Sequence, residues 1–218
     1  MNSLIIYDCD STLSSIEGVD ELGRLKGEEV RRQVEDLTNQ AMGGFIELEN
    51  VFEKRMELIR PTQHELNQIS KLYQETLAPG AQEVIDQLKE DGWLQAVVSG
   101  GLFPPVKHLA SYLGISEVMA VPVEFDVSGN YVGFQADYYT ARSGGKPECV
   151  RLLKERYDVD YTVMVGDGVS DLETQSEVDL FVGFGAFVER EKVREQSDEF
   201  IRSFAELPDI LAKRRAKA

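Results

Sequence analysis

Two aspartates, Asp8 and Asp10, directly follow a short apolar segment at residues 4–7. An apolar run that ends in a polar turn is typical of a buried strand in a parallel sheet, and such sheets bind ligands beyond the carboxyl ends of their strands. Side chains two apart in extended chain point the same way, so both carboxylates would face one spot. Two like charges held together need a cation or a shared proton. A turn or helix cap is the plain alternative, because Asp, Ser and Thr are common in both.

Further apolar segments also end in polar turns that contain glycine. Residues 93–98 lead into Ser99-Gly100-Gly101, and residues 162–165 lead into Gly166-Asp167-Gly168. A fourth turn, residues 143–146, opens a helix. In a parallel sheet these turns gather at one edge. The edge would then hold four carboxylates, two hydroxyls, backbone amides and one lysine, namely Asp8, Asp10, Asp167 and Asp171, Thr12 and Ser99, the amides of Gly100 and Gly101, and Lys146.

The charges at this edge predict a metal. Four carboxylates and one lysine leave a strongly negative pocket. Mg²⁺ favours a few carboxylates plus substrate oxygens and water, and it would supply the missing positive charge. The site would still be anionic, so one carboxyl group should hold a proton, which is the condition for a general acid near neutral pH. Helix capping is the alternative for Asp167 and Asp171, although it does not explain why four acids and a lysine converge.

Residues 14–76 contain no strand-like run and have helical composition. We expect about four helices, over residues 17–25, 28–42 and 45–59 and then beyond Thr62, where Thr62 and Glu65 form a capping-box pattern. The third carries apolar residues on one face at helical spacing. A crossover between parallel strands ordinarily needs one helix. The surplus predicts an inserted cap.

The remaining chain alternates strands and helices. We expect helices over residues 81–91 and 104–113, after Lys146 and from Val188 onward, strands over 93–98, 162–165 and 180–183, and a hairpin over 118–134 around residues 128–130. The predicted fold is α/β. It has a Rossmann-like parallel-sheet core of residues 1–13 and 77–218, an inserted helical-bundle cap of residues 14–76, and a small β-hairpin insert.

Composition narrows the class of protein. The chain has 218 residues, 42% of them hydrophobic, and a net charge of −16. Such an acidic surface repels nucleic acid and anionic membranes, and no apolar stretch is long enough to span a bilayer. The N-terminus lacks the features of a signal peptide, and Cys9 and Cys149 are too few for a disulfide scaffold. We expect a cytoplasmic protein, monomer or homodimer, that acts on a small molecule.

The motifs DCDST, VVSGG, SGGK and GDGVSD resemble those of the haloacid dehalogenase-like phosphohydrolases. EGVDEL and AMGG, with Arg55 thirteen residues after Met42, resemble the branch of that family that acts on phosphoserine. The resemblance covers nearly the whole chain. It implies a Mg²⁺-dependent phosphomonoesterase that hydrolyses O-phospho-L-serine through an aspartyl phosphate, as the last step of serine biosynthesis.

The resemblance also implies roles for individual residues. Asp8 would be the nucleophile, and Asp10 would protonate the leaving alkoxide and then take a proton from water. Lys146 would neutralise developing charge on the phosphoryl group. The metal ligands would be Asp8, the backbone carbonyl of Asp10, Asp167 and Asp171. Ser99 and the amide of Gly100 would hold phosphoryl oxygens, and Gly101 and Ser170 would also bind substrate.

Specificity would come from the cap. The resemblance implies that Glu17 accepts the substrate ammonium, that Arg55 pairs with its carboxylate, and that Met42 and Gly43 line the pocket. Arg55 also lies at the edge of an apolar helical stripe, three residues after Phe52, where a charge needs a partner or a ligand. The alternative is an arginine whose head group reaches water.

Two positions depart from the family pattern, and other functions stay open. Leu48 replaces the usual phenylalanine, and Phe103-Pro104-Pro105 replace polar residues after the SGG turn, which could shift the substrate loop.

The same chemistry could transfer the phosphoryl group to a small alcohol or use a related ester such as phosphohomoserine. A receiver-like phospho-aspartate switch is less favoured, because it needs neither Asp10 nor a cap. Cap movement would use hinges near Ser14 and Leu77.

Overall fold

The computed structural model describes residues 2–42 and 48–215, and its centre is a six-stranded sheet. Each pairing between neighbouring strands is parallel, which confirms the predicted α/β class. The strands in spatial order are β3 (Glu117–Val121), β2 (Leu94–Leu102), β1 (Ser3–Tyr7), β6 (Tyr161–Gly166), β7 (Leu180–Phe184) and β8 (Glu199–Ile201). The chain moves outward from β1 in one direction and then from β6 in the other. The order therefore reverses between β1 and β6, where sheets of this kind bind ligands.

The position of strand β1 in the sheet explains its unbroken apolar sequence. All five of its residues are buried. Ile5 and Tyr7 belong to one hydrophobic cluster, whereas Leu4 and Ile6 belong to a second. Because successive side chains of a strand point to opposite faces, β1 lies between two apolar layers.

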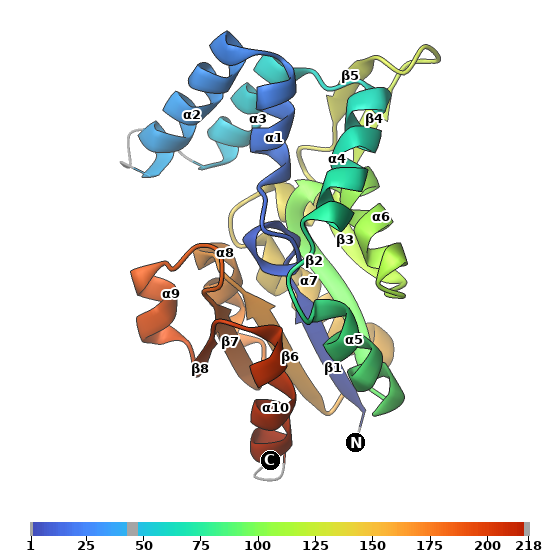
Figure 1. Cartoon of the computed structure of the whole chain (residues 1–218), viewed down its shortest axis with the longest axis vertical. Coiled ribbons are helices and arrows are strands. Elements are labelled where there is room, and N and C mark those ends of the chain that lie inside the picture. The colour runs from blue at the N-terminus through green and yellow to red at the C-terminus, as the bar shows by residue number, and fades with distance from the viewer. Residues whose placement is uncertain (1, 43–47, 216–218) are drawn as a thin grey trace.

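Helices and short helical turns cover this sheet (Figure 1). They are α5 (Ala81–Glu90), α6 (Phe103–Tyr112), η2 (Tyr139–Ala141), α7 (Gly145–Tyr157), α8 (Val169–Leu172), η3 (Glu173–Ser176), α9 (Glu191–Gln196), η4 (Phe204–Glu206) and α10 (Leu207–Arg215). The proline-containing segment after Gly101 begins α6 with proline in its first turn, as a helix allows. Among the residues that the structure describes, no helix is long and apolar enough to cross a membrane.

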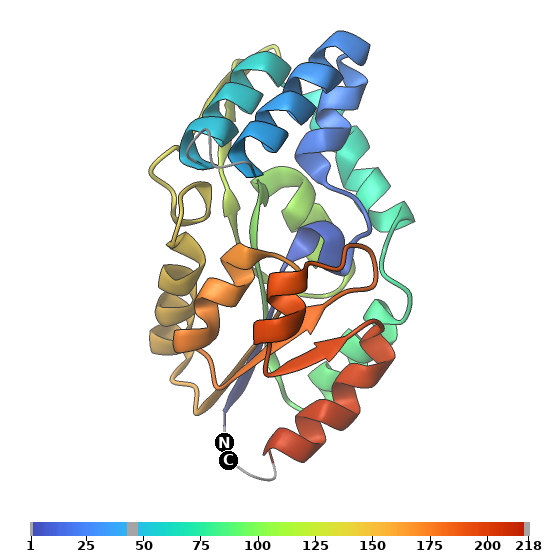
Figure 2. The same cartoon turned by 90° about the vertical axis from the view of Figure 1, so that its left-hand side faces the viewer.

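A second group of helices follows the tight turn η1 (Cys9–Leu13). It consists of α1 (Gly18–Leu25), α2 (Glu28–Met42), α3 (Leu48–Ile59) and α4 (Gln63–Glu75). In both views these four helices lie together at one end of the molecule (Figures 1 and 2). The predicted capping box of α4 is present, with Thr62 and Glu65 exchanging hydrogen bonds. The predicted start of the third helix at residue 45 lies outside the described residues.

The two segments that connect these helices to the sheet run side by side. Ser14 and Leu77 form an isolated antiparallel bridge. The amide of Ser15 donates to the carbonyl of Thr76 at 3.0 Å, and the amide of Ala78 donates to the carbonyl of Leu13 at 2.8 Å. A domain division at residues 14 and 76 remains our proposal, and these adjacent crossings support it.

The predicted hairpin over residues 118–134 was wrong in its first part. Residues 117–121 form β3 of the main sheet, because Met119, Ala120 and Val121 are buried against it. The antiparallel hairpin consists of β4 (Val123–Phe125) and β5 (Tyr131–Phe134). It extends from the sheet toward the cap helices (Figure 1).

Two more predictions about strands were wrong. Strand β2 does not end at Val98, because its backbone stays extended through the Ser99-Gly100-Gly101 segment to Leu102. The region after Val188 is not simply helical, because β8 pairs with β7 between α9 and α10. This edge strand has only three residues, so it carries too short a pattern to recognise.

Candidate active site

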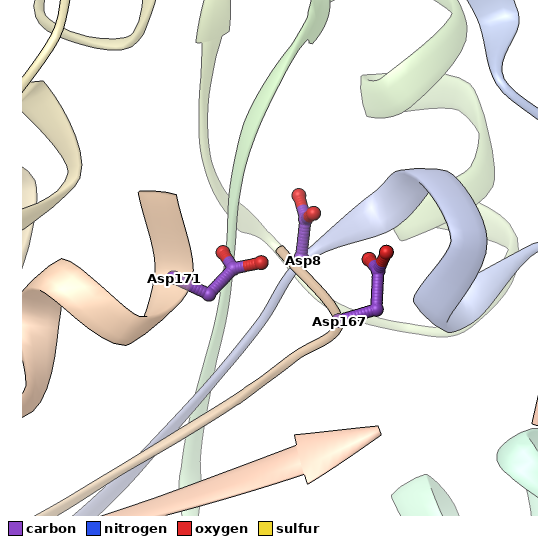
Figure 3. Close-up of side chains that lie close together, drawn as sticks. All are labelled: Asp8, Asp167 and Asp171. Atoms are coloured by element: carbon purple, nitrogen blue, oxygen red, sulfur yellow. The ribbon is translucent and has the colours of Figure 1, made fainter. Parts of the chain in front are cut away.

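Three aspartates meet where β1 and β6 end (Figure 3). Asp8 directly follows β1, Asp167 directly follows β6, and Asp171 lies in α8. Each offers a carboxylate oxygen, and these oxygens lie within 4.8 Å of one another. All three residues are buried. The amide of Asp8 donates to the carbonyl of Val165 at 2.9 Å, which fixes the two strand ends together.

Lys146 connects two of these carboxylates. Its Nζ lies 2.9 Å from Oδ1 of Asp8 and donates to Oδ1 of Asp171 at 2.6 Å. Burial by itself would lower the pKa of Lys146, but the charges of Asp171 and Asp8 raise the pKa above its usual value. The lysine is therefore charged, and it balances only part of the cluster.

The remaining negative charge is relieved by a proton or by a cation. Burial, and then the charge of Asp8, raise the pKa of Asp171 to about 7 against the lowering effect of Lys146. Three close carboxylate oxygens are the hard donors that Mg²⁺ prefers. The residues present therefore fit a divalent cation.

Asp10 is turned away from this cluster of three. Its Oδ1 accepts hydrogen bonds from the amide of Gly18 at 2.7 Å and from the hydroxyl of Tyr73 at 2.6 Å. Burial, followed by the charges of Glu17 and Asp8, raises the pKa of Asp10 to about 7, and the two hydrogen bonds lower it. A metal contact from Asp10 is predicted through its backbone carbonyl, and that contact remains a prediction.

One cavity of about 320 Å³ joins the cluster to the cap helices. Residues predicted for the site make up most of its wall, and they are Asp8, Asp10, Glu17, Arg55, Gly100, Gly101, Lys146, Asp167 and Ser170. Val19, Phe52, Gly168 and Arg190 complete it. The cavity therefore contacts both the strand ends and the cap.

The two predicted specificity residues, Glu17 and Arg55, bond to other side chains, and each also has a polar group that could still bind a ligand. Glu17 accepts a hydrogen bond from the hydroxyl of Ser11 at 2.7 Å, and 45% of its side chain is exposed. Burial, with Asp8 and Asp20, raises the pKa of Glu17, whereas Ser11 and Arg190 lower it. Arg55 donates to Asp20, and its buried Nε has no hydrogen-bond partner among the described residues.

Other predicted residues lie elsewhere or are not described. Ser99 is fully buried, and its hydroxyl accepts a hydrogen bond from the amide of Gly101 at 3.0 Å. It lies within β2 and does not line the cavity. The side chains of Met42 and Leu48, and the whole of Gly43, lie outside the described residues.

Two residues of the site, Arg190 and Tyr73, give no clear signal in the sequence. Arg190 donates to Oδ2 of Asp167, and its other terminal nitrogen lies 3.9 Å from Oε1 of Glu17. It stands in a run of charged residues, where an arginine resembles an ordinary surface residue. Tyr73 follows Ile69 by four residues on α4, so it resembles part of the apolar face of that helix.

Comparisons with known proteins agree with this geometry. A family profile described as haloacid dehalogenase-like hydrolase matches residues 3–178. A protein of Bos taurus named phosphoserine phosphatase is 36% identical over 205 residues, which cover 93% of this chain and 90% of that protein. One from Methanocaldococcus jannaschii with the same name is 30% identical over 190 residues, covering 84% and 85% of the two chains.

Solved structures are similar over almost the full length. One described as a phospho-aspartyl intermediate analogue of phosphoserine phosphatase has a TM-score of 0.81 and 26% identity, and the match covers 96% of this chain and 98% of that chain. A substrate-bound phosphoserine phosphatase complex has a TM-score of 0.83 and 25% identity with the same coverage.

Proposed function

Since the chain belongs to the haloacid dehalogenase-like hydrolases and is a phosphatase of that family, we propose that it hydrolyses O-phospho-L-serine to L-serine and phosphate with Mg²⁺. The names of its relatives support this substrate. The reaction would be the last step of serine biosynthesis. The proposed compartment is the cytoplasm, in keeping with two cysteines that are both free and buried.

The observation that carries the proposal is the shared cavity. Its floor holds Asp8, Asp167 and Lys146, which suit a phosphoryl group and its metal, and its cap side holds Glu17 and Arg55. Phosphoserine has an ammonium and a carboxylate besides its phosphate. A carboxylate and a guanidinium across one cavity match these two groups.

The proposed chemistry has two steps. An oxygen of Asp8 attacks phosphorus, the bond from phosphorus to the serine oxygen breaks, and Asp10 gives its proton to that oxygen. A water molecule then attacks the aspartyl phosphate and gives its proton to Asp10, and the bond from Asp8 to phosphorus breaks. The pKa of Asp10, raised to about 7 by burial first, suits a group that gives and then takes a proton.

The side chains of Asp8, Asp167 and Asp171 and the carbonyl of Asp10 would hold Mg²⁺. The ion supplies positive charge to the phosphoryl oxygens. Lys146, held against Asp8, adds a second positive charge on the same side.

Contacts to the remaining substrate atoms are also proposed. Glu17 would accept the ammonium and Arg55 would bind the carboxylate. The amide of Gly100 and the hydroxyl of Ser99 would hold phosphoryl oxygens, with Gly101 and Ser170 also binding substrate, and Met42 and Gly43 would line the pocket. The substrate is small enough for a monomer or homodimer to enclose it without further partners.

The test is phosphate release from a panel of small esters with Mg²⁺. The panel contains phosphoserine, phosphohomoserine, phosphoethanolamine (which lacks the carboxylate) and p-nitrophenyl phosphate, each with and without an added alcohol. We expect the highest kcat/KM with phosphoserine, unchanged phosphate yield with alcohol present, and no turnover by Asp8→Asn. A drop in free phosphate on adding alcohol would instead indicate phosphotransfer.

Arg55→Ala tests the substrate assignment within the same panel. Loss of a charge-assisted hydrogen-bonding pair costs about 2–3 kcal/mol, which is roughly 30- to 150-fold in kcat/KM for phosphoserine. Phosphoethanolamine should lose less than about threefold, because it has no carboxylate to bind. Lys54→Ala, an exposed neighbour on α3, is the matched control. Equal losses for both substrates would contradict a carboxylate-binding role.

A further inference from the structure

Tyr73 is a buried tyrosine of the cap helix α4, and its hydroxyl reaches Asp10 just beyond the end of strand β1. It lies near the end of α4, and only 1% of its surface is exposed. Its hydroxyl donates to Oδ1 of Asp10 at 2.6 Å, across 63 positions of sequence. The hydroxyl of a buried tyrosine needs a hydrogen-bond partner, and this one finds it in Asp10, so the contact fixes the direction in which that carboxyl oxygen points.

Gly18 makes this contact possible. Its amide donates to the same oxygen of Asp10 at 2.7 Å. A Cβ at position 18 would lie 2.2 Å from the hydroxyl oxygen of Tyr73 and 2.9 Å from Cζ. A side chain there would therefore displace the phenol, so glycine supplies both a donor and the room for the second donor.

The other oxygen of Asp10 faces a different wall. A Cβ on Gly101 would lie 2.9 Å from Oδ2 of Asp10, so Oδ2 is directed at the end of β2. Gly101 and Asp10 both line the cavity. Two donors hold Oδ1 on the side of the cap, and Oδ2 is left for the side where substrate would bind.

We infer that Tyr73 is a positioning residue for the reaction: by holding Oδ1 of Asp10, its hydroxyl turns Oδ2 toward the leaving oxygen of the phosphate ester. The inference rests on the proposed function, because it takes Asp10 as the proton donor. With Oδ1 accepting two hydrogen bonds, the transferable proton is carried on Oδ2. Tyr73 touches neither phosphorus nor the leaving group, and it acts only through Asp10.

Comparing two leaving groups separates positioning of a proton donor from general damage. A serine alkoxide needs a proton as it leaves, whereas p-nitrophenolate is stable without one. The value of kcat/KM reports the first irreversible step, which is transfer of phosphorus to Asp8. We expect Tyr73→Phe to lower kcat/KM about tenfold or more with phosphoserine and less than about threefold with p-nitrophenyl phosphate, with little change in KM.

Three variants make the comparison sharp. Tyr7→Phe is the matched control, because it also removes the hydroxyl of a fully buried tyrosine, one bonded to Gln95 away from the cavity. Gly18→Ala should reproduce the Tyr73→Phe pattern, since its methyl group displaces the phenol. Asp10→Ala sets the largest ratio between the two substrates that loss of the proton donor can produce.

Each outcome decides something definite. Equal losses with both substrates, or no loss with either, would overturn the role of Tyr73 while leaving the proposed function intact. If Asp10→Ala itself showed no preference between the leaving groups, the assignment of Asp10 would fail and the inference with it. If Tyr73→Phe melted far below the wild type, Gly18→Ala would decide whether the leaving-group preference follows the contact.

Discussion

Asp167 accepts hydrogen bonds from two other side chains of the site. The hydroxyl of Thr12 donates to its Oδ1 at 3.0 Å, and Arg190 donates to its Oδ2. The same carboxylate is one of the three that would hold Mg²⁺. The guanidinium and the divalent ion would therefore share one acceptor.

This sharing leads to a prediction for Arg190→Ala. Without the guanidinium, Asp167 gives up no ion pair when the metal binds, so Mg²⁺ should bind more tightly. An ion pair of this partly exposed kind contributes about 0.5–1.5 kcal/mol, which corresponds to roughly a two- to tenfold lower Kd. Calorimetric titration with MgCl₂ measures the Kd without any turnover.

The control for that titration is Arg194→Ala. Arg194 lies on α9 and pairs with Glu189 at 3.1 Å, away from the acid cluster. Its removal changes the net charge equally but should leave the Kd for Mg²⁺ unchanged. A Kd that rises in Arg190→Ala would show that the arginine supports the metal and does not compete with it.

Residues that directly follow a strand could be predicted from the sequence to lie at the site. Asp8 and Asp167 could be placed together because parallel strands end at one edge, and their separation in sequence does not matter. Tyr73 and Arg190 could not, because each belongs to a helical or charged pattern that is ordinary by itself. Only the packing of α4 and of the segment before α9 brings them to the site.

Among the elements, the hairpin β4–β5 joins the sheet to the cap helices. The rings of Phe134 and Phe52 lie 5.1 Å apart, and Phe52 lines the cavity. Arg60 donates to the carbonyl of Tyr131 at 3.3 Å and lies over its ring. The hairpin therefore supports the cap from outside, next to one wall of the substrate cavity.

Phe134→Ala should loosen this support. Loss of the ring pair removes about 0.5–1.5 kcal/mol of aromatic interaction besides burial, and it leaves Phe52 without its neighbour. We expect KM for phosphoserine to rise severalfold while kcat changes less than about twofold, since the acid cluster is untouched. Steady-state kinetics and a thermal melt measure the two effects.

Val127→Ala provides the comparison for the hairpin. Val127 is fully exposed at the hairpin tip, so its truncation should alter neither KM nor the melting temperature. An unchanged KM in Phe134→Ala, beside a lowered melting temperature, would show that the hairpin stabilises the fold without shaping the cavity.

The elements themselves could be predicted unevenly from sequence. The helices of the cap and strands β1, β6 and β7 carry long or clear apolar patterns, so their type was correct. The extent of β2 was wrong because Ser99, Gly100 and Gly101 resemble a turn, although the strand continues through them and pairs with β3 again at Leu102. Strand β8 forms because it pairs with β7, and the three residues Glu199–Ile201 have no pattern that predicts this pairing.

For the molecule as a whole, the buried carboxyl groups make the free energy of unfolding depend on pH. The chain carries a net charge of −16. Burial is the main cause that raises the pKa of both Asp10 and Asp171 from 3.8 to about 7. Between those values the folded chain keeps protons that the unfolded chain releases, so the free energy of unfolding falls as pH rises.

We therefore expect the metal-free protein to be more stable at pH 5.5 than at pH 8, by about 2–4 kcal/mol, since each such proton contributes about 1.4 kcal/mol per pH unit. Carboxylates with a lowered pKa, such as Glu65 and Asp126, act in the opposite sense only at more acidic pH. Urea denaturation in EDTA at several pH values measures the trend.

Two further measurements, one with Mg²⁺ and one on a variant, show which groups cause this pH dependence. Mg²⁺ at pH 8 should restore part of this stability, because the ion takes the place of the proton on Asp171, which belongs to the cluster. Asp10→Asn should reduce the slope between pH 5.5 and 7 by about half, since one of the two buried protons is gone. A metal-free protein whose stability rises from pH 5.5 to 8 would contradict this account.

The bridge between Ser14 and Leu77 has a consequence for how such a protein can diversify. The chain leaves the sheet and returns to it at neighbouring points that are already hydrogen-bonded. A segment whose ends are held together in this way can be exchanged for one of another length at a small entropic cost to the rest of the fold. With the roles proposed here for the cap and for the strand ends, substrate choice and phosphorus chemistry would be encoded in separable stretches of the gene, and recombination could change the first while the second is inherited intact.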